Sequence, residues 1–317
     1  MTSVPPPPPP AADAPDGRVT VAVITRDRPR SVLRTLDALS ALPERPPVIV
    51  VDNGSDAATT AAVRRHPATT RLVEPHRNTG ALGRNLAARH ADTPYVAFSD
   101  DDSWWAPGAL RQAADLLDTH PRLGLVTART LVGPDHTEDP LNTLLAASPL
   151  PAQADLPGQP VLGFLACAGV VRKDAFLAVG GFHPLLFFNG EETLLAYDLT
   201  AAGWGVTYVP TLTAHHHPEP SSRHGRSHLA RRNEVLTRWL RRPLRVALRS
   251  TTRLAADALA GRPGARHALR EVIARLPAAL ARRRRLPPHV EHAARLLDEE
   301  AARTRTDPDD TPVPPPG

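Results

Sequence analysis

The chain lacks several features that mark secreted and membrane-spanning proteins. Among its 317 residues there is one cysteine, Cys167, so no internal disulfide can form and a reduced, cytoplasmic setting is expected. No stretch approaches the roughly 20 apolar residues that cross a bilayer, and the Pro-rich start has no apolar signal-peptide core. Aromatic residues amount to only 4%, so alanine and leucine must supply most of the core.

Charge divides the chain into unlike parts. Residues 1–217 carry 17 basic and 22 acidic side chains, whereas residues 218–305 carry 21 basic and 8 acidic ones. Proline runs occupy both ends. These patterns predict four segments. They are a disordered tail over 1–17, an α/β domain over 18–217, a basic helical extension over 218–305 and a disordered tail over 306–317.

Strand-like and helix-like segments alternate through the first of the two large segments. Apolar, β-branched runs predict strands at 19–25, 47–51, 95–99, 123–131 and 206–209, with helical periodicity at 29–39, 79–90, 107–117 and 193–202. This alternation predicts an α/β fold with a mainly parallel sheet and helices on both faces. Residues 133–160 show no clear period and are expected to form a long loop or lid.

Three consecutive carboxylates, Asp100, Asp101 and Asp102, follow the predicted strand at 95–99. Adjacent negative charges repel one another, and a fold accommodates them mainly where a cation neutralises them. The carboxyl ends of parallel strands are also where open α/β sheets bind ligands. The triplet therefore predicts a metal-dependent site for a phosphate-bearing ligand.

Other candidate residues have two interpretations each. Asp52 ends a predicted strand at the same sheet edge, and it suits either a ribose contact or a simple turn with a helix cap. Arg84, next to Asn85, suits a diphosphate or a solvated helix face. Glu191 and Glu192 begin a predicted helix. They suit either a favourable interaction with the helix dipole or the role of a base near the metal.

Two further clusters are a histidine triplet and an arginine run. Neighbours in an extended chain point to opposite sides, so one of His215–His217 is expected to reach the metal. A separate zinc site is not expected, because Cys167 has no partner cysteine at ligand spacing. The run Arg282–Arg285 suits a solvated face first, an anionic membrane second and nucleic acid last, since no aromatic stacking residues accompany it. No nucleic-acid partner is expected.

In order along residues 19–240, several segments resemble the motifs of family 2 glycosyltransferases, GT-A-fold enzymes that use nucleotide sugars. The similar segments are Thr25-Arg-Asp-Arg-Pro29, Val50-Val-Asp-Asn-Gly-Ser-Asp56, Asn78-Thr-Gly-Ala-Leu-Gly-Arg-Asn85, Ser99-Asp-Asp-Asp-Ser-Trp-Trp105, the block Gly180–Glu192, Val209–His216 and Arg231–Trp239.

The resemblance implies a metal-dependent, inverting transfer of a hexosyl or deoxyhexosyl group from a nucleoside-diphosphate sugar to a hydroxyl acceptor, in cell-wall, polysaccharide, lipid-linked or secondary-metabolite glycans. It implies donor binding by Thr25, Arg26, Asp52, Asn53, Arg84, Asn85, Asp100 and Asp101. It implies Mg²⁺ or Mn²⁺ at Asp102, Asp100 and His216.

The resemblance also implies that Glu192, with Glu191 beside it, is the catalytic base. The family commonly has Glu-Asp at these two positions, with the base at the second. Glu192 is one methylene longer than that aspartate, so the acceptor pose can differ. A nucleotidyltransferase is an alternative, but no Gly-rich, Lys-bearing phosphate loop follows the first strand. A non-catalytic nucleotide-sugar-binding protein is another. The basic extension is a candidate for peripheral docking on the inner face of the membrane, where a lipid-linked acceptor would be presented.

Overall fold

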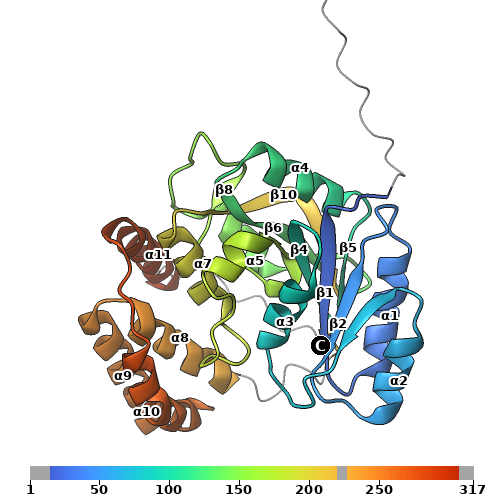
Figure 1. The fold of residues 1–317 in the computed structure, drawn as a ribbon. Helices are drawn as coiled ribbons and strands as arrows, with labels where there is room; N and C mark the ends of the chain where they lie inside the picture. Colours follow the sequence, from blue (N-terminus) through green and yellow to red (C-terminus); the bar gives the residue numbers. More distant parts are fainter. Residues whose placement is uncertain (1–14, 220–226, 307–317) are drawn as a thin grey trace, which may run out of the picture.

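A mixed sheet with helices on both sides forms the centre of the structure (Figure 1). The structure is a computed structural model that describes residues 15–219 and 227–306. Of the two tails predicted to be disordered, residues 1–14 and 307–317 lie outside the described residues. Residues 15–17 lead into the first strand, and Asp16 there accepts hydrogen bonds from Arg18.

The sheet of the described residues has ten strands. They are β1 (Val19–Thr25), β2 (Val48–Asp52), β3 (Thr69–Val73), β4 (Tyr95–Asp100), β5 (Ser103–Trp105), β6 (Leu123–Val132), β7 (Thr137–Glu138), β8 (Gln159–Pro160), β9 (Gly169–Arg172) and β10 (Gly205–His216). Their order is β3-β2-β1-β4-β9-β6-β10-β5, with β7 beside β6 and β8 beside β10. The pairs among β3, β2, β1 and β4 are parallel, as is β6 with β10, while β9 runs antiparallel between β4 and β6. The predicted, mainly parallel sheet is confirmed.

Helices cover both faces of this sheet. They are α1 (Pro29–Ser40), α2 (Ala57–Arg65), α3 (Leu82–His90), α4 (Ala109–Thr119), α5 (Pro140–Ala146), α6 (Lys173–Ala178) and α7 (Glu192–Ala201), with a 3₁₀ turn η1 at Ala166–Ala168. Alternate residues of β1 face opposite layers. Val21 and Val23 belong to the apolar cluster that contains the buried faces of α1 and α4, and Ala22 and Ile24 to the cluster of α3, α6 and α7.

Two segments differ from the sequence expectation. The expected loop at 133–160 contains β7, α5 and β8, and it is anchored where Asn142 exchanges two hydrogen bonds with the backbone of Thr130 at 3.0 and 2.8 Å. The strand predicted to end at Val209 continues to His216, because an irregularity between Val209 and Thr213 absorbs Pro210 without ending the pairing with β6.

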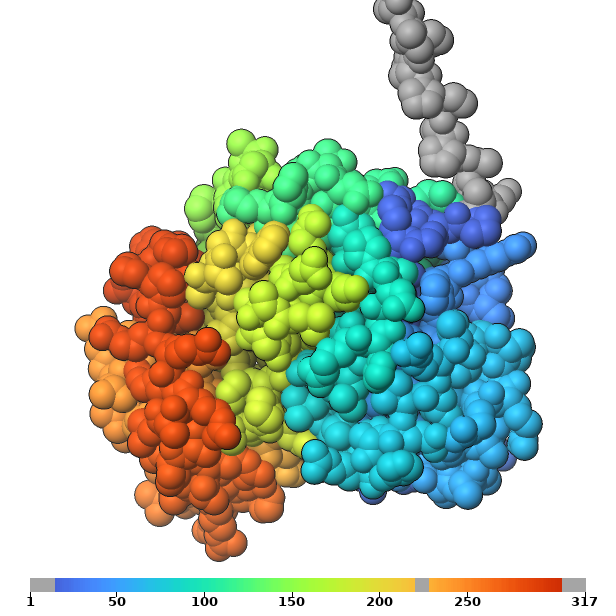
Figure 2. Space-filling view, in the orientation of Figure 1, coloured from blue at the N-terminus to red at the C-terminus, as the bar shows by residue number. Residues whose placement is uncertain are grey.

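Four helices make up the C-terminal part: α8 (Ser227–Arg241), α9 (Leu244–Leu259), α10 (Ala265–Ala281) and α11 (Pro288–Thr306). They lie together on one side of the α/β part, coloured orange and red in the space-filling view (Figure 2). A bidentate pair joins buried Arg241 of α8 to Asp198 of α7, at 2.5 and 2.8 Å. The domain boundary at 217/218 stays a prediction.

Part of the basic charge of these helices is internal. Arg232 and Arg242 are buried and pair with Glu271 and Glu291 at 2.7 Å each. Arg283, inside the arginine run, donates to the backbone carbonyls of Trp239 and Arg242, near the end of α8. Charge in this region therefore stabilises helix packing as well as facing solvent. Among the described residues, no helix combines the length and apolarity needed to span a bilayer.

Candidate active site

A cavity of about 680 Å³ opens at the carboxyl-terminal edge of β1, β2 and β4. Most of the residues singled out from the sequence line it: Thr25, Arg26, Asn53, Arg84, Asp100, Asp101, Asp102, Glu191, Glu192 and His216. Two of them, Asp52 and Asn85, are not part of the lining. The topology explains this gathering, because parallel strands deliver the residues that follow them to the same edge.

Asp101 and Asp102 are held by one arginine. The same Nη1 of Arg28 contacts a carboxylate oxygen of Asp101 and lies 3.0 Å from Oδ2 of Asp102. The hydroxyl of Thr25 donates to Asp101 at 3.1 Å. Burial raises the pKa of Asp101 to about 7, although the charge of Arg28 opposes the rise. Arg28 and Thr25 thus fix the buried side chain of Asp101 at the edge of the cavity.

Asp102 faces His216. Its Oδ1 lies 3.5 Å from Nε2 of His216, which β10 places opposite Ser103 of β5. Burial alone would raise the pKa of Asp102, but the hydrogen bond and charge of His216, together with Arg28, hold it below its ordinary value. For His216 burial acts in the opposite direction and lowers the pKa. The hydrogen bond and charge of Asp102 outweigh this effect, so the pKa of His216 is raised overall.

Neighbouring histidines of the triplet face elsewhere, as alternation along a strand requires. The rings of His215 and His217 lie 6.0 and 4.5 Å from the ring of Trp104, centroid to centroid. One of the three histidines therefore reaches the carboxylates, and it is His216.

Arg84 connects the third acid to the far wall of the cavity. Its buried guanidinium contacts Asp100 through Nη2, and its Nη1 lies 3.3 Å from Oε1 of Glu191. The rings of Phe182 and Phe188 lie 5.4 and 5.8 Å from the guanidinium carbon. The interpretation of Arg84 as part of a solvated helix face is wrong, because the side chain is buried between two protein carboxylates. Its contact with a diphosphate stays a prediction.

Glu191 and Glu192 stand at the start of α7. Burial raises the pKa of Glu191 well above its ordinary value, and the charge of Glu192 adds to the rise. Burial also raises the pKa of Glu192, against the backbone N–H groups nearby and the charge of Arg84. Oε2 of Glu191 has no hydrogen-bond partner in the described part of the chain. Two carboxyls with raised pKa values in one cavity suit proton transfer.

Asp52 and Arg26 flank this centre. The carboxylate of Asp52 accepts from the N–H of Ser55 at 2.8 Å and from the hydroxyl of Thr60 at 2.5 Å, so it fixes the turn between β2 and α2. Arg26 is more than half exposed, and its Nε lies 3.5 Å from a carboxylate oxygen of Asp27.

Two asparagines fasten loops around the cavity. Oδ1 of Asn53 accepts from the N–H of Thr79 at 3.0 Å, which ties the entry of α3 to the end of β2. Asn85 exchanges hydrogen bonds with the backbone of Phe182, both at 2.9 Å, and so fixes the turn after α6. Only Asn53 also lines the cavity.

Sequence reasoning gave Arg28 no role of its own. The wall made by residues 186–190, of which Phe187, Phe188 and Asn189 line the cavity, belongs to the block Gly180–Glu192 that resembles a family motif. Asn233 of α8 donates to the carbonyls of Leu186, Phe188 and Asn189 at 2.8–3.0 Å, which holds this wall against the C-terminal helices. The backbone of Asn189 is left-handed, with φ of 71°. The signal available for Arg28 was its position after β1, at the edge where ligands bind.

The donor atoms suit a divalent cation. Ligands about 2.1 Å from an octahedral ion lie about 3 Å apart, and the 3.5 Å between Asp102 Oδ1 and His216 Nε2 is near that spacing. Asp100 is turned toward Arg84, so these residues offer two ligand atoms side by side rather than three. Magnesium is commonly held by one or two carboxylates together with substrate phosphates. The residues therefore fit such an ion.

Comparison with known proteins adds an independent line of evidence. A model of glycosyl transferase family 2 matches residues 20–180. A Mycobacterium tuberculosis protein named N-acetylglucosaminyl-diphospho-decaprenol L-rhamnosyltransferase is 30% identical over an alignment of 269 residues that covers 70% of this chain and 86% of the relative. A pre-mycofactocin glycosyltransferase of the same species is 29% identical over 211 residues, covering 63% of this chain and 43% of the relative.

Solved structures give the same picture. A mannosyltransferase from Pyrobaculum calidifontis, in complex with GDP-Man and Mn²⁺, is similar with a TM-score of 0.54 and 25% identity, over 93% of this chain and 84% of that one. Residues 1–349 of TarS from S. aureus, in complex with UDP-GlcNAc, are similar with a TM-score of 0.57 and 14% identity, over 91% and 92%. The second likeness shows the fold alone.

Proposed function

As the chain belongs to glycosyl transferase family 2 and has the GT-A fold, we propose that it is a metal-dependent, inverting enzyme that moves a sugar from a nucleoside diphosphate to a hydroxyl acceptor. The observation that carries the proposal is the single cavity that holds both the Asp102–His216 pair and Glu192. The Asp102–His216 pair suits the binding of a cation and a diphosphate, and Glu192 suits the role of proton acceptor.

On the donor side, Asp102 and His216 would hold Mg²⁺ or Mn²⁺, and Asp100 would act through Arg84, toward which it is turned. When bound, such an ion neutralises the negative charge that develops on the leaving nucleoside diphosphate. Thr25, Arg26 and Asn53 line the same cavity and would contact the nucleoside of the donor. Asp52 and Asn85 would act indirectly, since their hydrogen bonds shape the loops around the cavity.

On the acceptor side, Glu192 would take the proton of the attacking hydroxyl. A carboxyl with a raised pKa is a stronger base than an exposed one and suits a reaction near neutral pH. Attack from the face opposite the diphosphate inverts the anomeric carbon. Glu191 would act through Arg84, which it orients beside Asp100.

A second cavity supports an acceptor with an apolar part. It measures about 470 Å³, and its lining runs from Gly190 and Thr193, beside Glu192, outward between α5 and α11. Much of the lining is apolar: Leu141, Leu144, Leu145, Val161, Leu162 and Leu297. A lipid-linked acceptor would place its sugar at Glu192 and its first apolar units here. The decaprenol in the name of the mycobacterial relative supports this choice.

The outer surface of α9 and α10 supports peripheral docking on an anionic membrane from the cytoplasmic side. Its exposed apolar side chains are Leu244, Leu248, Leu259, Ile273 and Leu280. Exposed arginines such as Arg245 and Arg249 stand next to them. Membrane-docking surfaces typically combine apolar side chains, which enter the lipid interface, with basic side chains, which attract the lipid phosphates.

A donor panel tests the proposal. Purified protein with Mg²⁺ or Mn²⁺ is incubated with nucleoside-diphosphate hexoses and deoxyhexoses, with and without a polyprenyl-diphosphate-linked sugar, and the released nucleotide is identified. Acceptor-dependent release of nucleoside diphosphate is expected. Release of pyrophosphate would favour the nucleotidyltransferase alternative, and nucleotide binding without turnover on any donor would favour a binding protein.

A further inference from the structure

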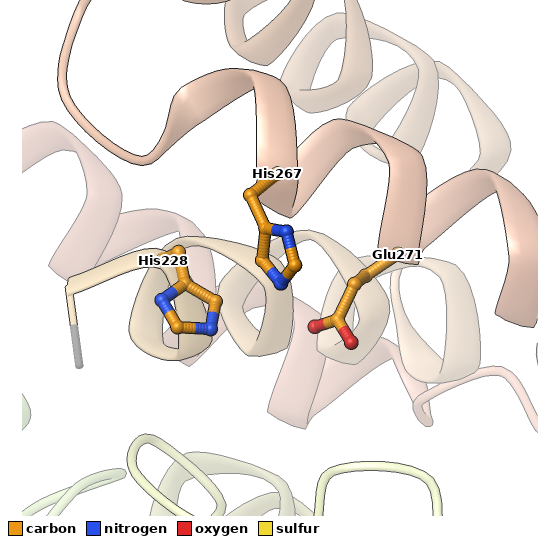
Figure 3. A group of neighbouring side chains, drawn as sticks. All are labelled: His228, His267 and Glu271. Carbon is orange, nitrogen blue, oxygen red and sulfur yellow. The ribbon is translucent and has the colours of Figure 1, made fainter. Parts of the chain in front are cut away.

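Three side chains of the C-terminal helices, none of which lines the cavity that holds Asp102, come together. His228 stands in the first turn of α8, and His267 and Glu271 lie one turn apart on α10. One ligand atom from each lies within 4.8 Å of the other two. Figure 3 shows the three side chains directed into the space between α8 and α10.

The chemistry of this group suits a transition metal. Two imidazoles and one carboxylate are a common zinc donor set, with water completing a tetrahedron. Tetrahedral ligands about 2.0–2.1 Å from zinc lie roughly 3.3 Å apart, so side-chain rotations suffice to close the group. The Asp102 site offers one carboxylate oxygen and one imidazole nitrogen, and the oxygens of a donor diphosphate would complete it, which suits magnesium or manganese better. His267 is exposed, which leaves the group open to solvent.

Surrounding residues orient the carboxylate. Arg232 donates to Oε2 of Glu271 at 2.7 Å, and Nη1 of Arg275 lies 3.2 Å from Oε1. Carboxylates that bind a metal usually also accept hydrogen bonds from neighbouring side chains, which hold them in position. Because Arg232 also donates to the carbonyl of Leu186 at 2.6 Å, the group is one residue removed from the wall of the catalytic cavity.

We propose that His228, His267 and Glu271 bind one Zn²⁺ ion that joins the start of α8 to α10 and, through Arg232, stiffens the wall at residues 186–190. The ion adds a link between two helices that are otherwise joined by packing and by the Arg232–Glu271 pair. Binding only to the folded chain raises stability in proportion to the logarithm of the ion concentration.

Titration of the metal-stripped full chain tests this site. Calorimetry with Zn²⁺ on the Asp102→Asn variant, which has lost the principal ligand of the catalytic ion, is expected to show one site. The double variant His228→Gln/His267→Gln in the same background is expected to lose it. The matched control His289→Gln/His292→Gln, which alters two exposed histidines of α11, is expected to keep it. The thermal midpoint should rise with Zn²⁺ in the control and stay unchanged in the double variant.

Cobalt gives a readout that needs no variant. Co²⁺ bound to the metal-stripped chain by two imidazoles and a carboxylate in a tetrahedral site produces intense visible d–d bands, which Zn²⁺ then removes by displacement. Absence of these bands, or equal Zn²⁺ binding by the double variant and its control, overturns the proposal. Neither result bears on transfer activity at Asp102, so this site and the catalytic proposal fail independently.

Discussion

Nη1 of Arg84 lies 3.3 Å from Oε1 of Glu191, and both side chains are almost completely buried. The other terminal nitrogen of Arg84 contacts Asp100. One guanidinium thus links the end of β4, where the acids proposed to bind the metal begin, to the start of α7, where the proposed base stands. This link joins the two halves of the cavity through charge.

Arg84→Gln is expected to destabilise the protein by about 3–5 kcal/mol, because it leaves a buried carboxylate without its cation. Urea denaturation measures the change. Glu234→Gln, which breaks an exposed pair with Arg238, is the control and should cost at most about 0.5 kcal/mol. Arg84→Gln/Glu191→Gln should recover part of the loss, and strictly additive losses would contradict the coupling.

Glu192→Gln should lower kcat by roughly 10²–10⁴-fold while the Kd for the nucleoside-diphosphate sugar stays unchanged, since the variant removes only the proton acceptor. A base works when deprotonated, and the pKa of Glu192 is raised. The rate should therefore rise with pH through a value above that of an ordinary glutamate. Glu191→Gln is the comparison, and an unchanged kcat for Glu192→Gln would rule the residue out as base.

The sheet and the site edge could be predicted from sequence because they follow from local pattern. Runs such as Val19–Thr25 have a single structural interpretation, and strand ends bring Asp52 and Asp100 to one edge. Whether a side chain then faces a ligand or a turn depends on distant partners. Asp52 has the same sequence signature as a nucleoside ligand, yet it bonds Ser55 and Thr60.

Long-range pairing explains what the sequence did not reveal. Arg28 meets Asp101 only after β1 and β4 pair, and the antiparallel direction of β9 is not encoded in its short apolar run. His228 and His267 lie on separate helices, so no ligand spacing in the sequence marks the group that they form with Glu271, and the absence of paired cysteines says nothing about it.

Metal removal should abolish transfer by the wild-type chain, and Mn²⁺ or Mg²⁺ should restore it. Asp102→Asn should lose this response, because it removes the negatively charged carboxylate that is proposed to bind the ion beside His216. Nucleotide release after chelation and metal addition measures both. Asp115→Asn, which alters an exposed acid of α4, is the control. Full activity of Asp102→Asn after chelation would exclude a metal role for this acid.

Leu144→Asp should weaken use of a lipid-linked acceptor without harming the fold, since Leu144 is 64% exposed and lines the apolar cavity beside Thr193. Loss of one leucine contact of about 1.5 kcal/mol corresponds to roughly a tenfold rise in KM. An acceptor without its lipid chain should show no such change. Leu259→Asp, assayed in detergent, is the control, and an equal KM for both variants on the lipid-linked acceptor would contradict this use of the cavity.

Binding to anionic vesicles should depend on the outer surface of α9. Leu244 and Leu248 are about half exposed and lie one turn apart, with Arg245 and Arg249 beside them. Leu244→Asp/Leu248→Asp removes two apolar groups and adds two negative charges, so co-sedimentation with phosphatidylglycerol vesicles should fall at least tenfold. Leu144→Asp serves as the control because it changes an exposed leucine on α5. The wild-type chain should bind less at high salt and bind poorly to neutral vesicles, because the arginines act through screened charge. Equal sedimentation of both variants would show that this surface does not contact lipid.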